Sequence, residues 1–295
     1  MIATPGSATL PFDVHGSGPG VVLLHAGVTD RRGWAPLLPV LRPDHRVVAF
    51  DARGFGESSY EPEPFSRATD AVAVMDAADL GPAVLIGNSM GGKTAIDVAI
   101  DHPDRVTALV LIGAPISGAP QGEDDPPEVR ALWEEMKDAE EAEDLDALNR
   151  LEARFWLDGV PAPEGRVTGA TRDLFLEMNG RALAAPDPGE EDRSSVAWTR
   201  LEEIVVPTLF LVGDLDLEEF QRLGEQAASR IPGATFVGLA GVAHLPVLEG
   251  DPACLTAISQ FVGSLGPALQ TRSSTSAIMN AHGNRRSSGT APGCI

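Results

Sequence analysis

Short apolar runs alternate with amphipathic stretches along the first 113 residues. Four runs are rich in Val, Leu and Ile and bounded by Gly, Pro or Asp, as expected for strands covered on both faces. They are residues 21–27, 46–51, 83–87 and 108–113. The stretches between them favour helices, at 34–42, 66–80 and 92–103. Repeated alternation of strand and helix predicts an α/β fold with a mostly parallel sheet and flanking helices.

The pattern changes in the middle of the chain. Residues 117–200 contain no convincing strand; they hold an acidic helical region followed by a Pro/Gly-rich stretch. The alternation then resumes with apolar runs at 207–213 and 234–240 and a final helix near 251–265. The middle region therefore interrupts a single α/β domain.

This interruption divides the chain into three parts. We interpret residues 1–116 and 201–265 as one core domain and residues 117–200 as a helical cap inserted into it. Residues 266–295 are rich in Ser, Gly and Thr, carry three arginines and no acid, and lack periodicity. Such a composition buries too little apolar surface to fold, so we expect a disordered tail.

Composition excludes several classes of function. Apolar residues make up 43% of the chain and charged residues 22%, as in ordinary globular proteins, but the formal net charge is -21. Binding to nucleic acid or to an anionic membrane needs clusters of Lys and Arg, so we expect neither partner. Residues 123–152 carry thirteen acidic residues against three basic ones, which indicates a solvated helical face.

No sequence signal predicts export or a cofactor. The N-terminal segment has no basic stretch followed by an apolar run, and no apolar run is long enough to span a membrane. Two cysteines, Cys254 and Cys294, cannot build a disulfide framework, so a cytoplasmic location is expected. We find no metal-ligand cluster, phosphate loop or dinucleotide motif, and so expect no cofactor and no metal.

A serine stands at the turn between the run at 83–87 and the following helical stretch. Residues 87–91 read Gly-Asn-Ser-Met-Gly, which fits the G-x-S-x-G pattern in its strand–turn–helix context. Glycine is favoured two places before and after Ser89, because larger side chains would collide with neighbouring backbone in so tight a turn. The hydroxyl of Ser89 is therefore a candidate nucleophile.

A serine nucleophile needs a base, and the base needs an acid to orient it. The two strands expected after the insertion each end in suitable residues. Asp214 and Asp216 follow the run at 207–213, and His244 follows the run at 234–240 in a Gly/Ala-rich loop. His244 is the candidate base, and the residues alone leave either aspartate open as the acid.

With these residues the chain resembles the α/β-hydrolase superfamily over about residues 8–265. Five motifs occur in the expected order: LLHAG, DARGFGES, GNSMGG, VGDLD and AGVAHLP, beginning at residues 23, 51, 87, 212 and 240. The resemblance implies the α/β-hydrolase fold with an inserted cap and assigns the acid to Asp216. It also implies an oxyanion hole made by the backbone amides of Gly27 and Met90, with His25 shaping the loop.

The resemblance also bears on the reaction. Because the turn holds serine where other branches of the superfamily hold aspartate, we expect cleavage of a small carboxylic ester or lactone through an acyl-enzyme. The branches that the chain resembles are the esterases and the 3-oxoadipate enol-lactonases. The same triad is compatible with a carbon–carbon bond hydrolase or a cofactor-free perhydrolase. A catalytically inactive binding or scaffold member is the alternative outside the enzymes.

The substrate pocket is less defined by the sequence. Trp34, Trp133 and Trp156 are candidates to line it, although aromatic residues in helices also serve as ordinary core. Arg31 and Arg32 follow the oxyanion loop, where a guanidinium could orient a substrate carboxylate or simply be solvated. The expected partner is a small ester or lactone.

Overall fold

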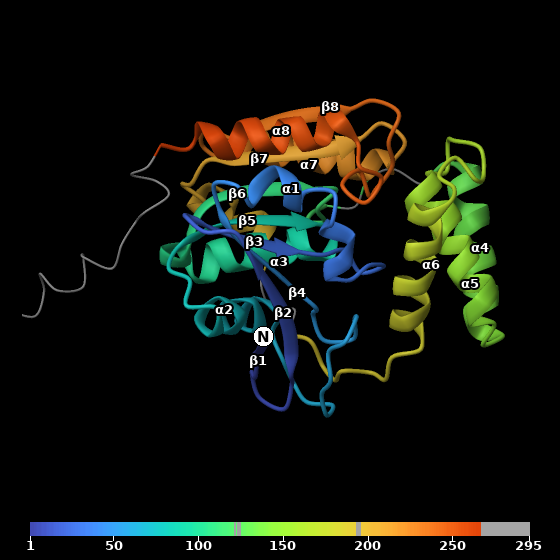
Figure 1. Cartoon of the computed structure of the whole chain (residues 1–295). Coiled ribbons are helices and arrows are strands. Elements are labelled where there is room, and N and C mark those ends of the chain that lie inside the picture. Colours follow the sequence, from blue (N-terminus) through green and yellow to red (C-terminus); the bar gives the residue numbers. More distant parts are fainter. Residues whose placement is uncertain (121, 123–124, 193–195, 267–295) are drawn as a thin grey trace, which may run out of the picture.

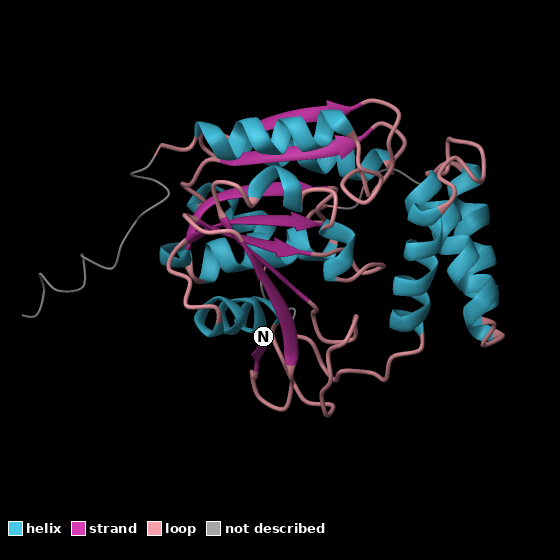
Figure 2. Ribbon diagram, in the orientation of Figure 1, coloured by secondary structure: helices cyan, strands magenta, loops and turns pink. Residues whose placement is uncertain are grey.

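The computed structural model describes residues 1–120, 122, 125–192 and 196–266, so the expected tail lies almost entirely outside the described residues. Eight strands form one sheet in the order β1-β2-β4-β3-β5-β6-β7-β8 (Figure 2). They are β1 (Ile2–Ala3), β2 (Leu10–His15), β3 (Gly20–Leu24), β4 (Arg46–Phe50), β5 (Ala83–Asn88), β6 (Val106–Ile112), β7 (Thr208–Gly213) and β8 (Thr235–Leu239). β1 and β2 pair antiparallel to their neighbours, and the other six strands are parallel.

Helices cover both faces of the sheet. Along β3, Val22 and Leu24 face the core beneath α2, α3 and α7, whereas Val21 and Leu23 face the core beneath α1 and α8 (Figure 1). All four side chains are buried, which explains why the strand has no polar face. The helices are α1 (Leu38–Leu41), α2 (Arg67–Ala77), α3 (Met90–Asp101), α4 (Pro127–Glu141), α5 (Leu145–Glu152), α6 (Ala170–Leu183), α7 (Glu218–Arg230) and α8 (Pro252–Ser264).

This architecture confirms the predicted fold class, and the local differences have physical reasons. The helix expected at 34–42 is broken into a 3₁₀ turn (Arg31–Trp34) and the short helix α1. Pro36 and Pro39 interrupt this stretch, and proline disrupts a helix interior. The antiparallel strands β1 and β2 were not predicted, because they are short and lie at the edge of the sheet.

The order of the strands creates a crevice at the centre of the sheet. β3 and β5 are neighbours, but the chain proceeds from β3 outward to β4 and from β5 outward to β6, β7 and β8. The connections after β3 and β5 therefore lead in opposite directions. In open α/β sheets, ligands bind at such a switch point, beyond the carboxyl ends of the strands.

Three helices, α4, α5 and α6, lie between β6 and β7 in sequence. They form a separate layer beside the edge of the sheet at which the parallel strands end (Figure 1). Within the described part of 117–200, the only strand-like pairing is an isolated bridge between Glu191 and Phe65. Phe175 and Met178 of α6 pack with Ala26 and Leu245 of the core domain. None of the described helices combines the length and the apolar character that a membrane crossing requires.

Candidate active site

Ser89 lies in the turn that joins β5 to α3. Its backbone has φ 52° and ψ -119°, a positive-φ conformation that residues other than glycine rarely adopt. The amide of Ser89 donates a hydrogen bond to the carbonyl of Ile112 at 2.8 Å, which ties the turn to β6. A strained residue held in this way at the sheet's switch point indicates a functional position.

The two glycines around Ser89 leave no room for a side chain. A Cβ atom on Gly87 would lie 2.3 Å from the carbonyl oxygen of Gly91, and one on Gly91 would lie 2.0 Å from the carbonyl oxygen of Leu24. Both obstacles are backbone atoms, which cannot move without disturbing the sheet. The spacing G-x-S-x-G is therefore a packing requirement of this turn.

We expect Gly91→Ala to lower the free energy of unfolding by about 1–3 kcal/mol, the usual cost of overpacking a tight interior. The new methyl group would overlap the backbone of Leu24 at the end of β3. Chemical denaturation measures the change. Gly263→Ala in α8 is the matched control, because no atom lies within 4 Å there, and it should stabilise by roughly 0.5–1 kcal/mol. Equal changes in the two variants would contradict the clash.

His244 and Asp216 meet at the ends of β8 and β7. Nδ1 of His244 lies 2.8 Å from Oδ2 of Asp216, and both side chains are buried. Because a carboxylate can only accept, Nδ1 is the donor of this hydrogen bond, and in a neutral imidazole with this tautomer the lone pair is on Nε2. The other oxygen of Asp216 accepts from the amide of Leu217 at 2.8 Å, which fixes the carboxylate.

Asp214, the other candidate acid, has a different partner. It is exposed, and its Oδ1 accepts a hydrogen bond from the amide of Gly241 at 2.7 Å. The structure therefore brings Asp216, and not Asp214, to His244. Asp214 instead holds the loop after β8 against the end of β7.

Two residues around His244, Phe220 and Gly113, were missed by sequence reasoning. The ring of Phe220 lies 4.8 Å from that of His244 between centroids, and Trp156, already a pocket candidate, lies 4.7 Å from it. A Cβ atom on Gly113, which has φ +50°, would lie 2.9 Å from Nδ1 of His244 and 3.0 Å from Oδ2 of Asp216. Glycine at the end of β6 therefore makes room for the histidine–aspartate pair, and the two aromatic rings pack against the imidazole.

Asn88 connects the serine turn with the histidine loop. Its Nδ2 donates to the carbonyl of Ile112 and to the carbonyl of His244, both at 3.0 Å. The residue is buried and stands directly before Ser89. A polar residue at the end of an otherwise apolar strand is the signal that could have identified it.

Asn88 thus ties the turn that holds Ser89 to the loop that holds His244. No hydrogen bond between the side chains of Ser89 and His244 is found in the described part of the chain. Nε2 of His244 is buried and has no hydrogen-bond partner among the described residues. A buried nitrogen with a free lone pair is costly unless a donor approaches it. Catalytic hydrogen bonds are often long in sites without ligand and tighten when substrate binds.

Gly27 and Met90, the residues expected to form the oxyanion hole, lie close to one another. A Cβ atom on Gly27 would lie 3.8 Å from that of Met90. Met90 is the first residue of α3, and the first amides of a helix have no acceptor within it. The positive end of the helix therefore faces the space beside Ser89.

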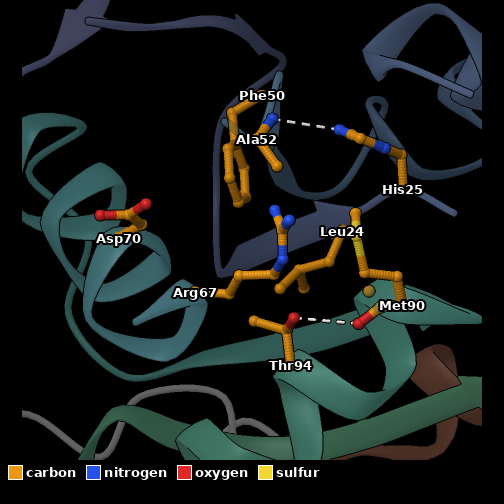
Figure 3. A pocket seen from close by; sticks show the side chains of 9 residues that line it. Leu24, His25, Phe50, Ala52, Arg67, Asp70, Met90 and Thr94 are labelled. Carbon is orange, nitrogen blue, oxygen red and sulfur yellow. Dashed lines mark hydrogen bonds between the residues drawn. The ribbon is translucent and has the colours of Figure 1, made fainter. Parts of the chain in front are cut away.

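His25 precedes Gly27 in the same loop and is bonded to Ala52, a bond drawn in Figure 3. Its Nε2 accepts from the amide of Ala52 at 3.0 Å, and its Nδ1 donates to the carbonyl of Ala26 at 2.8 Å. Burial lowers the pKa of His25, which keeps the ring neutral and suited to this pair of bonds. Both nitrogens are used, so His25 has none left for proton transfer.

Two cavities that touch these residues differ greatly in size. One of about 10 Å³ lies beneath Met90 and is lined by His25, Arg67 and Thr94 (Figure 3), which is room for about one water molecule. The other, of about 560 Å³, lies between the beginnings of α4 and α7 and reaches the site only at Asp216. The larger one has the size of a small-molecule pocket, whereas the smaller one does not.

The three candidate pocket tryptophans separate in space. Trp156 touches His244, and Trp133, which is 39% exposed, packs on Trp156 with ring centroids 5.9 Å apart. Trp34 is buried in the core beneath α1 and α8, and it also lines a cavity of about 10 Å³ with His25 and Asn88. Only the first two therefore share one aromatic cluster, together with Phe155.

Arg31 and Arg32 are both engaged by carboxylates of the protein. The guanidinium of Arg31 pairs with the side chains of Asp13, Asp51 and Glu57. The guanidinium of Arg32 pairs with those of Asp30 and Glu177. These ion pairs occupy the guanidinium groups that a substrate carboxylate would need.

No cluster of three or more metal-ligating side chains occurs within the residues that the structure describes.

Comparison with known protein families identifies the family of this chain. A family model described as the Alpha/beta hydrolase family matches residues 21–255. The chain belongs to this family. The match runs from β3 to the beginning of α8, so this α/β-hydrolase carries Ser89, Asp216 and His244 inside the matched region.

Individual relatives cover different parts of the α/β-hydrolase. The 2-hydroxymuconate semialdehyde hydrolase of Pseudomonas sp. (strain CF600) is 41% identical over 105 residues, which are 34% of this chain and 35% of that protein. The match thus spans about a third of that relative's length. The pimeloyl-[acyl-carrier protein] methyl ester esterase of Legionella pneumophila (strain Lens) is 26% identical over 272 residues, which are 85% of this chain and 98% of that protein.

Solved structures resemble the whole described core. The esterase RhEst1 from Rhodococcus sp. ECU1013 superimposes with a TM-score of 0.70 at 26% identity, covering 90% of this chain and 98% of that one. The similarity therefore extends over both halves of the core domain and the insertion between them.

Proposed function

We propose that this α/β-hydrolase cleaves a small carboxylic ester or lactone through Ser89, His244 and Asp216. The observation that carries the proposal is the hydrogen bond from His244 to Asp216 beside a serine held at positive φ. Ester hydrolysis in general is supported by the methyl ester esterase and the esterase RhEst1, which resemble the chain over most of its length.

The first half of the reaction uses the free lone pair of His244. Nε2 accepts the proton of the Ser89 hydroxyl while Oγ attacks the carbonyl carbon, and Asp216 stabilises the resulting imidazolium. Charge develops on the carbonyl oxygen, where the amides of Gly27 and Met90 donate hydrogen bonds to it. Collapse of this intermediate breaks the bond to the leaving alcohol, which takes the proton from Nε2.

Water completes the reaction. His244 removes a proton from a water molecule that attacks the acyl group on Ser89, and the same proton returns to Oγ as the acid is released. In a lactone the alcohol stays attached to the acyl chain, so the product is a single hydroxy acid. The residues have the same roles for both substrates.

Residues 117–200 serve in this proposal as a cap over the site. Trp156 reaches His244 from this segment, and Trp133 lies behind Trp156. These two rings offer an apolar surface to the substrate, whereas Trp34 supports the core domain.

A carbon–carbon bond hydrolase with the same triad is the second candidate. It is favoured by the local identity of 41% to a hydrolase named for a semialdehyde, a compound without an ester bond. The two candidates share Ser89 and differ in the bond that is cleaved.

Labelling with a fluorophosphonate tests the nucleophile, and a substrate panel tests the reaction. We expect one label per chain, on Ser89, and a loss of p-nitrophenyl acetate hydrolysis in proportion to labelling. The panel compares p-nitrophenyl acyl esters, γ-lactones and enol-lactones with diketones that carry no ester. Turnover by fully labelled protein would contradict the role of Ser89. Turnover of the diketones alone would favour the second candidate.

A further inference from the structure

Arg166 lies in the insertion, between a single turn of π-helix (Ala153–Asp158) and α6, and uses every donor of its guanidinium. Nε donates to the carbonyl of Asp158 at 2.8 Å, and Nη2 donates to that of Leu157 at 2.6 Å. Nη1 donates to the carbonyl of Gly241 at 3.1 Å. The two remaining bonds reach the carboxylate of Glu249, at 2.5 and 2.8 Å. An arginine with five bonds is held in one geometry.

These bonds join two segments that are distant in sequence. Leu157 and Asp158 belong to the insertion, whereas Gly241 and Glu249 flank the loop that carries His244. Glu249 also accepts a hydrogen bond from the amide of Ala243 at 3.2 Å, and its side chain is 8% exposed. A bidentate arginine–carboxylate pair with so little exposure is stronger than a surface ion pair.

The insertion touches the same loops at two further points. The indole of Trp156 lies against the ring of His244. Gly159, which has φ +82°, lies so close that a Cβ atom there would be 2.4 Å from the carbonyl oxygen of Leu215 and 3.0 Å from Cβ of Ala243. Leu215 precedes Asp216, and Ala243 precedes His244. The segment around Trp156 and Gly159 therefore packs against both loops that hold the histidine–aspartate pair.

We propose that Arg166 is a positioning residue for His244. Through Glu249 it fastens the inner part of the insertion to the histidine loop, and so it holds the imidazole against Trp156 and Phe220 with Nδ1 directed at Asp216. This inference rests on the proposed function, because it assigns Arg166 a role through the base of that reaction. The inner part of the insertion then belongs to the catalytic framework and not only to the wall of the substrate pocket.

Arg166→Lys is the main test. Lysine keeps the charge but has three donors on one atom and cannot make the bidentate pair. We expect kcat to fall about 10–100-fold, the loss typical of small misplacements of a catalytic group, with KM changed less than about twofold. The rate of fluorophosphonate labelling should fall by the same factor as kcat. The low-field proton signal of the His244–Asp216 hydrogen bond should weaken.

Arg172→Lys is the matched control. Arg172 pairs with the buried carboxylate of Asp158 and with the carbonyl of Val167, both within the insertion. We therefore expect kcat within about twofold of the unmodified protein, even if the thermal midpoint falls. Glu249→Gln keeps one oxygen that can accept from the amide of Ala243 and from Nη2 of Arg166, but it loses the charge and the bond to Nη1. Its loss of kcat should therefore be smaller than that of Arg166→Lys.

The outcomes separate the alternatives. An Arg166→Lys variant with unchanged kcat and labelling rate would overturn the inference, and so would a loss confined to KM. Equal losses of kcat and thermal stability in Arg166→Lys and Arg172→Lys would also overturn it, because both arginines would then act only on the stability of the insertion. Full activity in Ser89→Ala would instead refute the proposed function, independently of Arg166.

Discussion

Replacing Ser89 by alanine is expected to lower kcat for p-nitrophenyl acetate by about 10⁴–10⁶-fold, the range found when a triad nucleophile is removed. The variant keeps the amides of Gly27 and Met90 but has no hydroxyl to form the acyl-enzyme. The residual rate should be that of direct attack by water on a substrate held in the oxyanion hole. Initial rates and fluorophosphonate labelling on purified variants measure the effect, and labelling should vanish.

Ser229→Ala is the control for this comparison. Ser229 is exposed on α7, and its Oγ donates to the carbonyl of Gln226 at 2.7 Å, far from the turn in sequence. We expect its kcat and labelling to equal those of the unmodified protein. Should the Ser89→Ala variant retain more than a tenth of the original rate while folded, another nucleophile must act.

Asp216→Asn is expected to lower kcat by about 10⁴-fold. An amide at this position can donate toward Nδ1 of His244, which favours the tautomer with the proton on Nε2 and removes the lone pair needed by Ser89. The fold should be retained, because Asn keeps an oxygen that accepts from the amide of Leu217. Steady-state kinetics and the loss of the low-field proton signal measure the effect.

Asp214→Asn is the control for Asp216→Asn, because it makes the same chemical change two residues away. Asp214 is exposed, and its oxygen accepts from the amide of Gly241, a bond that asparagine can also make. We expect kcat to change less than about threefold. A large loss in this variant with little loss in Asp216→Asn would show that the acid had been assigned to the wrong residue.

The parallel strands could be predicted from the sequence because their side chains are buried on both faces. An apolar run as short as that of β5 is typical of a buried strand, and Gly87 and Gly91 mark the turn at its end. β2 (Leu10–His15) was harder to predict. It contains a proline, an aspartate and a histidine, and only its pairing with β4 reveals it as a strand.

The three candidate catalytic residues could be predicted from the sequence for a similar reason. Parallel strands that end at the same edge of a sheet bring the residues after them together, so Ser89, Asp216 and His244 could be selected by their position after a strand. The choice between two aspartates needed the resemblance to a family. In the structure it depends on which carboxylate is directed at Nδ1 of His244.

Most of the surroundings of His244 could not be predicted. Trp156 was a candidate pocket residue, but its contact with His244 was not foreseen, and Phe220 and Gly113 come from α7 and from the end of β6. Arg166 reaches Glu249 across 83 residues of sequence. No local pattern links such residues, because their contacts depend on how the insertion packs on the core domain.

The sequence by itself determined the class of fold, the tight turn at Ser89 and the short list of residues able to act with it. These features depend on local properties, namely burial of apolar runs and the absence of room for a Cβ atom beside the turn. Only the tertiary structure decided which aspartate meets His244, that Trp34 belongs to the core, and that Arg31 and Arg32 are already paired. Those outcomes depend on the directions of side chains from separate elements, which chain order does not specify.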